Sequence, residues 1–328
     1  MVMPARALLA GALAIALVQQ AAGPAHAQDY PSRPIKMIVP YPPGGPVDGT
    51  ARIISDRLGQ VLGQSVVIES KGGGAGGSVG AKFVAASDPD GYTLLITPGG
   101  TLTSGPAVYK NIGYDPAKAF APVALLIETS QIIFANPSLP VTTLAELKSH
   151  AEANPGKISW GSQGFGTGPH LLAEMFKLQA GVSIVHVPFR GTAPMQTALL
   201  ANEIQVAAGA ESGVLPYIEA GRVRPLAVAA KRRAMKLTDV PTTREAGYPK
   251  LIAPFWLGVV APAGTPRAIV DKLNAALRAS LAPPEIRERL GRLGADIQIG
   301  TPEEFGRLID EERIMWTELV EAAHLQVE

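Results

Sequence analysis

Glycine-rich turns stand between strand-like and helix-like segments at five places in this chain. Glycine lets a ligand approach bare backbone, and a helix N-terminus presents unpaired N–H groups with partial positive charge. In an open α/β sheet, ligands bind at the carboxyl ends of the strands, where such turns lie. Several turns facing one another therefore predict a socket for a small anion. The turns cover residues 40–48, 71–78, 98–101, 161–168 and 189–192. For part of 72–77, we expect the glycines to serve only as tight-turn residues.

Apolar strand-like runs alternate with amphipathic helical stretches along the chain. Such alternation predicts an α/β fold with parallel sheets and helices on both faces. The predicted strands are 35–39, 66–69, 92–97, 123–135 (one or two strands), 158–160, 184–187, 204–208, 226–230 and 256–261. The predicted helices are 47–62, 79–86, 144–151, 169–178, 194–200, 267–281, 284–293 and 302 to about 323. Thr143-x-x-Glu146 and Thr301-x-x-Glu304 are capping boxes that mark two helix starts.

The first 27 residues have the pattern of a secretory signal peptide. Arg6 precedes an apolar run at 7–18, and Ala25-His26-Ala27 forms a small-x-small cleavage site before Gln28. The run is shorter than the about 20 residues that span a bilayer. We therefore expect an exported protein that starts near Gln28, periplasmic in a Gram-negative host.

Charge and composition narrow the function classes. Arg6 is the only charged residue of the signal peptide, so its removal lowers the formal net charge from +1 to zero. A neutral chain argues against a nucleic-acid partner, because phosphate neutralisation needs a basic surface. The chain has no cysteine, which excludes disulfides, thiol nucleophiles and cysteine-ligated metals. The mature length of about 300 residues suits two domains, and no long linker separates them.

Motifs for catalysis and cofactors are weak in this sequence. Gly72, Gly74 and Gly77 match G-x-G-x-x-G, but no acidic residue ends a following strand, so we treat the match as accidental. There is no Walker A sequence, and there is no G-x-S-x-G nucleophile elbow around Ser159, Ser162 or Ser212. The histidines of the mature chain show no metal-ligand spacing. We expect no enzyme activity, no cofactor and no metal site.

Two side chains in or beside the turns are candidates for ligand contact. His170 lies at a helix start, where a local hydrogen bond is the first interpretation and a ligand contact the second. Arg190 has a guanidinium fork that can bind both oxygens of a carboxylate, and a plain surface arginine is an equal alternative. By contrast, Glu311, Glu312 and Glu318 are expected on the solvated face of the last helix.

Several stretches carry a resemblance to a known family. They are Tyr-Pro-Ser-Arg-Pro-Ile-Lys at 30–36, Pro-Tyr-Pro-Pro-Gly-Gly-Pro-Val-Asp at 40–48, Gly-Ala-Gly-Gly-Ser-Val-Gly at 74–80, Pro-Asp-Gly-Tyr-Thr-Leu-Leu at 89–95, Gly-Ser-Gln-Gly-Phe-Gly-Thr-Gly-Pro-His at 161–170, Val-Pro-Phe-Arg-Gly-Thr-Ala-Pro at 187–194 and Ala-Pro-Ala-Gly-Thr-Pro at 261–266. Together they resemble the extracytoplasmic solute receptors of tripartite tricarboxylate transporters, the Bug family of periplasmic binding proteins. The resemblance covers essentially the whole chain.

The resemblance implies a two-domain, type II periplasmic-binding-protein fold that closes on a ligand between its domains. Residues 28–125 and 229–328 would form domain I, and residues 126–228 would form domain II. Strands near 124–128 and 226–230 are the expected crossings between them. Family ligands are mostly small carboxylates, and one carboxylate is typically held by backbone and ordered water near the first Gly-Gly turn.

The same resemblance implies a set of substrate-binding residues. Domain I would contribute Tyr41, Gly44, Gly45 and Thr101. Domain II would contribute Ser162, Gly164, Thr167, Arg190, Gly191 and Thr192. His170 joins these candidates because of its place at the helix start, not because of the resemblance.

Two features bear on ligand chemistry. Many relatives carry an acidic residue where this chain has Gly209, and some of those relatives accept amino acids. Its absence disfavours an α-amino ligand, although Glu211 is near enough to keep that class open. Tyr41, Phe165 and Phe189 could pack on an aromatic or aliphatic body, so aromatic acids also stay open.

We therefore expect a monomeric periplasmic receptor that binds a di-/tricarboxylate or an aromatic acid. It would deliver this ligand to the transmembrane permease subunits of a tripartite tricarboxylate transporter. Two alternatives stay open: a ligand sensor that docks a two-component partner, and a periplasmic enzyme acting on a small carboxylate. The enzyme alternative needs a nucleophile–base pair, and none is visible in the sequence.

Overall fold

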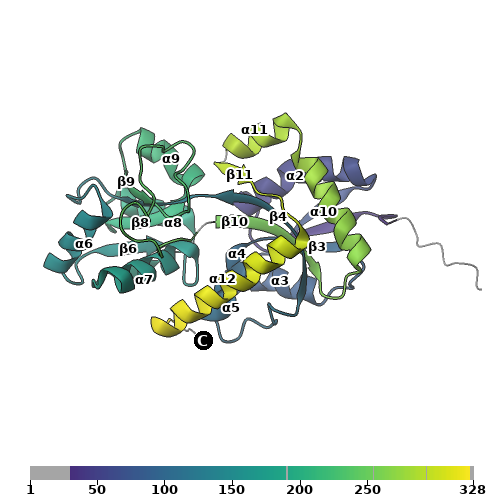
Figure 1. Cartoon of the computed structure of the whole chain (residues 1–328), viewed down its shortest axis with the longest axis horizontal. Helices are drawn as coiled ribbons and strands as arrows, with labels where there is room; N and C mark the ends of the chain where they lie inside the picture. The colour runs from purple at the N-terminus through teal and green to yellow at the C-terminus, as the bar shows by residue number, and fades with distance from the viewer. Residues whose placement is uncertain (1–29, 190, 254, 293, 326–328) are drawn as a thin grey trace, which may run out of the picture.

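The structure is a computed structural model that describes residues 30–189, 191–253, 255–292 and 294–325. Its strands form two separate sheets, and each sheet with its helices makes one of two lobes lying side by side (Figure 1). The predicted signal peptide, residues 1–27, lies outside the described residues. Within the described ranges, no helix combines the length and the apolar character that a membrane span needs.

The first lobe is built on a six-stranded sheet of order β11-β4-β10-β3-β1-β2. Its strands are β1 (Ile35–Val39), β2 (Val66–Ser70), β3 (Thr93–Pro98), β4 (Phe120–Thr129), β10 (Phe255–Pro262) and β11 (Ala295–Ile297). Its longer helices are α2 (Pro46–Leu62), α3 (Ser78–Ala85), α10 (Arg267–Leu281), α11 (Pro284–Arg292) and α12 (Pro302–Ala322). Three shorter ones are η1 (Ala75–Gly77), α4 (Gly99–Leu102) and α5 (Ser104–Val108).

Both faces of the first sheet are covered by helices, as predicted. Successive residues of a strand point to opposite faces. Met37 of β1 accordingly lies in an apolar cluster with residues of α2 and α10. Its neighbour Ile38 lies in a second cluster with residues of α3 and α12. The sheet is therefore buried on both sides, and its strand ends are held in fixed positions.

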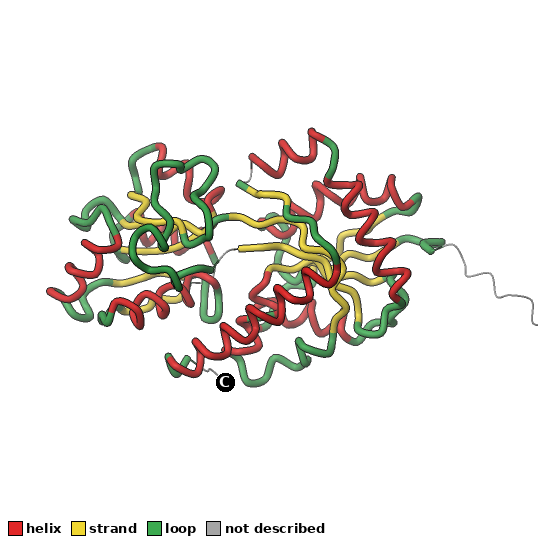
Figure 2. Tube along the Cα trace, viewed as in Figure 1, coloured by secondary structure: helices red, strands yellow, loops and turns green. Residues whose placement is uncertain are grey.

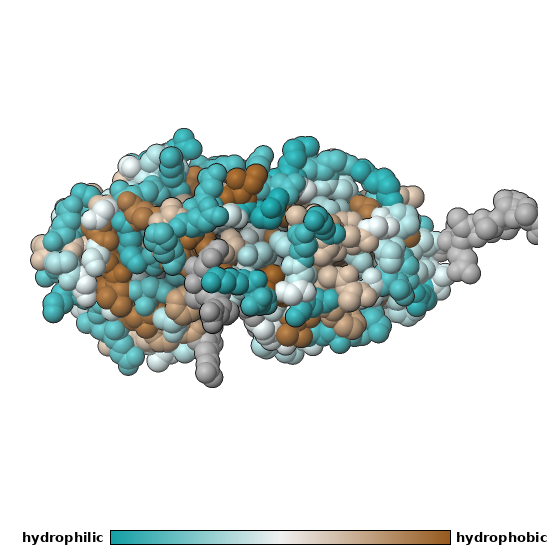
Figure 3. Space-filling model, turned by 90° about the horizontal axis from the view of Figure 1, so that it is seen from below, coloured by the Kyte–Doolittle hydropathy of each residue, from teal (hydrophilic) through white to brown (hydrophobic). Residues whose placement is uncertain are grey.

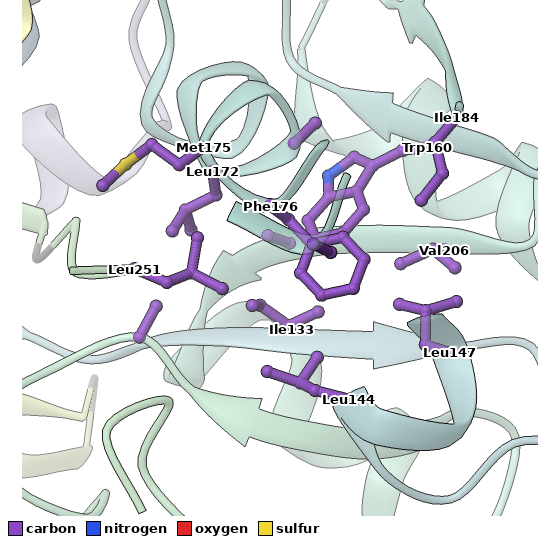
Figure 4. Packing of buried hydrophobic residues seen from close by; sticks show 14 of the residues in the cluster. Ile133, Leu144, Leu147, Trp160, Leu172, Met175, Phe176, Ile184, Val206 and Leu251 are labelled. Atoms are coloured by element: carbon purple, nitrogen blue, oxygen red, sulfur yellow. The ribbon is translucent and has the colours of Figure 1, made fainter. Parts of the chain in front are cut away.

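The second lobe is built on a five-stranded sheet of order β7-β6-β8-β5-β9. Its strands are β5 (Gln131–Ala135), β6 (Ser159–Ser162), β7 (Val185–Pro188), β8 (Val206–Ala210) and β9 (Arg224–Val228). Its helices are α6 (Leu144–Ala153), α7 (Gly168–Ala180), α8 (Thr192–Leu200) and α9 (Glu211–Glu219). Trp160 and Phe176 lie at the centre of its largest core cluster, with ring centroids 6.0 Å apart (Figure 4).

The sheets are mixed, whereas the sequence predicted parallel ones. Strands β1, β2 and β3 are parallel, and so are β6, β7 and β8. Strand β10 is antiparallel to both of its neighbours, and so is β5. Parallel pairing needs a crossover connection within one sheet. The chain reaches β5 and β10 from the other lobe, without a crossover within their own sheet. These two strands can therefore run antiparallel to their neighbours.

Two passages of the chain connect the two sheets (Figure 2). Strand β4 of the first sheet ends at Thr129, and β5 of the second sheet starts at Gln131. The return lies between β9, which ends at Val228, and β10, which starts at Phe255. The domain limits at 125/126 and 228/229 stay a prediction, because sheet membership alone does not define them.

Helix α12 spans both lobes (Figure 1). Its Phe305 packs in a first-lobe cluster, while Trp316 packs in the large cluster of the second lobe. The predicted Thr301–Glu304 capping box is confirmed, since each side chain bonds the other residue's backbone N–H. The prediction that Glu312 lies on a solvated face was wrong. Glu312 is 9% exposed and accepts a hydrogen bond from Trp256 Nε1 at 2.8 Å.

Exposed apolar side chains are spread over several elements. Examples are Val67 on β2, Phe83 on α3 and Leu178 on α7. From below, apolar patches alternate with polar residues (Figure 3). Scattered exposure of this kind is normal for a protein surface and does not indicate one docking face.

Candidate functional site

The glycine-rich turns lie where the sequence predicted them, at the carboxyl ends of parallel strands. In the first sheet, Val39 at the end of β1 pairs with Ser70 at the end of β2, so their turns start side by side. In the second sheet, Ser162 at the end of β6 pairs with Pro188 at the end of β7. Each lobe therefore presents a group of turns at one edge of its sheet, which is the edge where α/β proteins bind ligands.

Tyr41, Gly76 and Thr101 form a hydrogen-bonded cluster in the first lobe. The Thr101 hydroxyl donates to the Gly76 carbonyl oxygen at 2.7 Å, and the Tyr41 hydroxyl donates to the same oxygen at 3.1 Å. The two hydroxyl oxygens are 3.2 Å apart. Burial raises the pKa of Tyr41, so its phenol is neutral. The cluster joins the first three predicted turns.

Gly44 and Gly45 lead into helix α2. Gly45 is the N-cap residue of α2, and its position has no side-chain capping hydrogen bond. The Gly44 N–H donates to Asp48 Oδ2 at 3.0 Å, and Arg52 Nε donates to the same oxygen at 2.9 Å. The bond from Arg52 lowers the pKa of Asp48 most, and the bond from Gly44 lowers it further. This carboxylate is therefore ionised and paired. The turn is thereby fixed beside an open helix N-terminus.

The second glycine-rich turn has a packing role, as expected for part of it. Gly77 has φ +85°, and a Cβ there would come within 3.1 Å of the Pro40 carbonyl oxygen. A Cβ on Gly80 would come within 2.8 Å of Pro40 Cα. Only glycine therefore allows this turn to lie against the start of the first one.

In the second lobe, the ligand loop (residues 162–168) is held by its own side chains. Ser162 Oγ donates to the Gly164 carbonyl oxygen at 3.0 Å and accepts from the Gly164 N–H at 3.1 Å. Thr167 Oγ1 donates to the same carbonyl at 2.7 Å. The Gly166 N–H donates to His170 Nδ1 at 3.0 Å. His170 therefore makes the local hydrogen bond that was its first interpretation, and contact of these residues with a ligand stays a prediction.

A serine–histidine contact that the sequence did not reveal lies under this loop. Ser162 Oγ and His186 Nε2 are 2.6 Å apart, and the rings of His170 and His186 are 4.1 Å apart. Burial lowers the pKa of His170 to about 3 and that of His186 to about 4, so both are neutral near pH 7. Ser162 is 0% exposed, and its hydroxyl already bonds Gly164. The pair therefore braces the loop from below.

The fifth turn lies beside the ligand loop. The Phe189 N–H donates to the Ser162 carbonyl oxygen at 2.9 Å. Gly191, with φ +109°, is the N-cap residue of α8, and Thr192 is its exposed first residue. Arg190 lies outside the described residues.

Two contacts from the first part of the chain reach the ligand loop. Ser104 Oγ donates to the Gly166 carbonyl oxygen at 2.9 Å, and the Tyr109 hydroxyl donates to the Phe165 carbonyl oxygen at 3.1 Å. Both donors belong to α5 or its end, a helix of five residues that the sequence pattern did not predict. No group of three or more potential metal-ligating side chains occurs within the described residues.

Two α/β lobes with glycine-rich turns at the ends of their parallel strands define a solute-binding receptor of the periplasmic-binding-protein class. The family profile described as “Tripartite tricarboxylate transporter family receptor” matches residues 50–325. The chain belongs to this family.

Relatives of the chain extend the match over nearly its full length. Protein BugT of Bordetella pertussis is 34% identical over 300 residues, covering 91% of this chain and 92% of BugT. A UPF0065 protein in the tcbD-tcbE intergenic region of Pseudomonas sp. strain P51 is 35% identical, covering 96% of this chain and 93% of that protein.

Solved structures agree with this assignment. The periplasmic binding protein BugD is 36% identical, with a TM-score of 0.79 over 91% of this chain and 100% of BugD. The structure of R. palustris Rpa4515 with adipate has 35% identity and a TM-score of 0.81, over 90% of this chain and 98% of that one. The malate-bound MatC from Rhodopseudomonas palustris has 34% identity and a TM-score of 0.78, over 89% of this chain and 100% of MatC. The chain is a receptor and not an enzyme.

Proposed function

We propose that this protein is a periplasmic receptor that binds a small organic carboxylate between its lobes and passes it to the permease subunits of a tripartite tricarboxylate transporter. One observation carries the proposal. Helices α2, α7 and α8 start at three of the glycine-rich turns, and none of them has a side-chain cap at its N-terminus. Such N-termini bind anions through free N–H groups and the helix dipole.

The relatives support a carboxylate as the anion. Two solved relatives hold adipate and malate, which are aliphatic dicarboxylates. Phe165 is 43% exposed at the ligand loop and can cover an apolar ligand body. The favoured class is therefore a dicarboxylate, with tricarboxylates and aromatic acids as further candidates.

An amino acid is a weaker candidate. A Cβ on Gly209 would meet only ordinary contacts, at 3.7 Å from Phe134 and 3.9 Å from Gln163, and no acidic group stands there. Glu211 is 1% exposed, and its Oε1 accepts a hydrogen bond from the Lys236 backbone N–H at 2.9 Å. Because Glu211 is buried and one of its oxygens is already bonded, it is poorly placed to pair with a ligand ammonium group.

Export and assembly complete the proposal. The signal peptide predicted at 1–27 would deliver the protein to the periplasm, where receptors of this class meet their permeases. We propose that it acts there as a monomer.

A thermal-shift screen tests this function directly. Protein purified after export is heated with adipate, malate, a tricarboxylate, an aromatic acid or an amino acid. Because a ligand that binds only the folded state stabilises it, we expect one acid class to raise the unfolding midpoint. The dimethyl ester of the best acid serves as the control and should give no shift. If no acid shifts the midpoint, or if the ester shifts it equally, the carboxylate-receptor proposal is wrong.

Thr101→Val is expected to weaken binding of the best acid about tenfold, since it removes the hydroxyl that joins Gly76 and Tyr41. Titration calorimetry measures the affinity. Thr265→Val is the matched control, because Thr265 is also buried and also donates to a backbone carbonyl, that of Pro262, at 2.7 Å. Equal affinities for the two variants would show that the Thr101 cluster takes no part in binding.

A further inference from the structure

We propose that helix α5 positions the ligand loop, and that Ser104 and Tyr109 are positioning residues for ligand binding. The effect on affinity rests on the proposed function, whereas the effect on the loop does not. Ser104 is 2% exposed, and its hydroxyl holds the Gly166 carbonyl oxygen at 2.9 Å. Tyr109 holds the preceding carbonyl oxygen, that of Phe165, at 3.1 Å. Two consecutive peptide groups of the loop are thus held from outside the second lobe's own sheet.

Apolar packing surrounds these two bonds. Val108, which lies between the donors, is 0% exposed and belongs to the same apolar cluster as Leu171 of α7. Gly166 has φ +72°, and a Cβ there would lie 3.4 Å from both Val108 and the Tyr109 ring. Helix α5 therefore packs directly against the loop at Gly166, whose positive φ favours glycine.

The held carbonyls set the direction of the opposite N–H groups. A trans peptide is planar, so its N–H points away from its carbonyl oxygen. Fixing the Gly166 oxygen on Ser104 therefore directs the Thr167 N–H away from α5, at the uncapped start of α7. Fixing the Phe165 oxygen on Tyr109 directs the Gly166 N–H to His170 Nδ1. Ser104 thus prepares the N–H group that an anion would meet.

The same helix is joined to the first half of the socket. Thr101 belongs to α4, and only Thr103 separates α4 from α5. A Cβ on Gly105 would lie 2.7 Å from the Gly100 carbonyl oxygen, so the two helices touch backbone to backbone. A shift at Thr101 therefore moves Ser104 as well. This predicts that the two halves of the socket are energetically coupled.

Hydrogen exchange of the ligand-free protein tests the positioning role. We expect Ser104→Ala to speed exchange of amides in residues 163–168 about fivefold, which corresponds to one lost hydrogen bond. Tyr109→Phe should do the same, and it keeps the test decisive if the first variant fails to fold. Ser280→Ala is the matched control, because Ser280 is 0% exposed and donates to the Ala276 carbonyl oxygen at 2.7 Å within α10. The control should leave the loop unchanged.

Affinity for adipate and for malate is then measured with the same variants. We expect Ser104→Ala to weaken binding about fivefold. Its unfolding midpoint should fall by no more than that of Ser280→Ala. Unchanged loop exchange in both Ser104→Ala and Tyr109→Phe would overturn the positioning role. If the wild-type protein binds the acid, and the variants show faster loop exchange but bind with the same affinity, the proposed effect on ligand binding is refuted. Absence of binding to the wild-type protein would count against the proposed function alone, since loop exchange still decides the positioning role.

Discussion

Phe176→Ala is expected to lower the free energy of unfolding by about 3–5 kcal/mol, the usual cost of truncating a buried phenylalanine. Phe176 is 0% exposed, and its ring packs against Trp160 at 6.0 Å and against Tyr248 at 5.3 Å between centroids. Truncation removes these contacts and leaves a cavity in the middle of the second-lobe core (Figure 4). The surrounding helices are tied to the sheet and cannot close it fully.

Urea unfolding followed by tryptophan fluorescence measures this loss. Phe83→Ala makes the same chemical change on the surface, because Phe83 is 40% exposed on α3. It removes a contact with the Lys71 ammonium, 4.2 Å from the ring centroid, which is worth about 0.5–1 kcal/mol. We therefore expect the buried variant to lose several times more stability than the exposed one. Similar losses would mean that the second-lobe core relaxes around the cavity.

Sequence periodicity located most helices and strands because they bury apolar faces. Met37 and Ile38 show why, since each faces a different helical layer. The strand ends then placed the glycine-rich turns correctly. Helix α5 and strand β11 were missed, because five and three residues are too few to show a period. Helix α9 was missed as well, and it contains Pro216, a residue that disfavours a helix interior.

Side-chain roles at the turns were harder to predict, since they depend on contacts between distant residues. His186 lies 24 positions from Ser162, and only the parallel pairing of β6 and β7 brings them together. Ser104 meets Gly166 across 62 positions. Glu312 has exposed neighbours, Glu311 among them, so its burial against Trp256 leaves no mark in the local pattern.

Glu312 makes the stability of the protein depend on pH. Burial raises the pKa of this carboxyl from 4.5 to about 7, against the opposing hydrogen bonds from Trp256, Thr103 and Trp316. The nearby Glu128 carboxylate raises it further. Between pH 4.5 and about 7, Glu312 keeps its proton in the folded state and loses it in the unfolded state. The free energy of unfolding therefore falls as pH rises through this window. Above the folded pKa, the protein carries the whole cost of a buried charge.

Glu312→Gln should remove this pH dependence and stabilise the protein above pH 7 by up to about 3 kcal/mol, at about 1.4 kcal/mol per pKa unit. The amide oxygen of glutamine can still accept the hydrogen bond from Trp256, so the packing between α12 and β10 is kept. The midpoint is measured from pH 4.5 to 8 for wild type, Glu312→Gln and the exposed control Glu311→Gln. We expect the curves of wild type and Glu312→Gln to meet near pH 4.5 and to separate as pH rises, while the control follows wild type. Parallel curves for all three would show that Glu312 is ionised without cost, and that no neutral carboxyl group joins α12 to Trp256 of the first lobe.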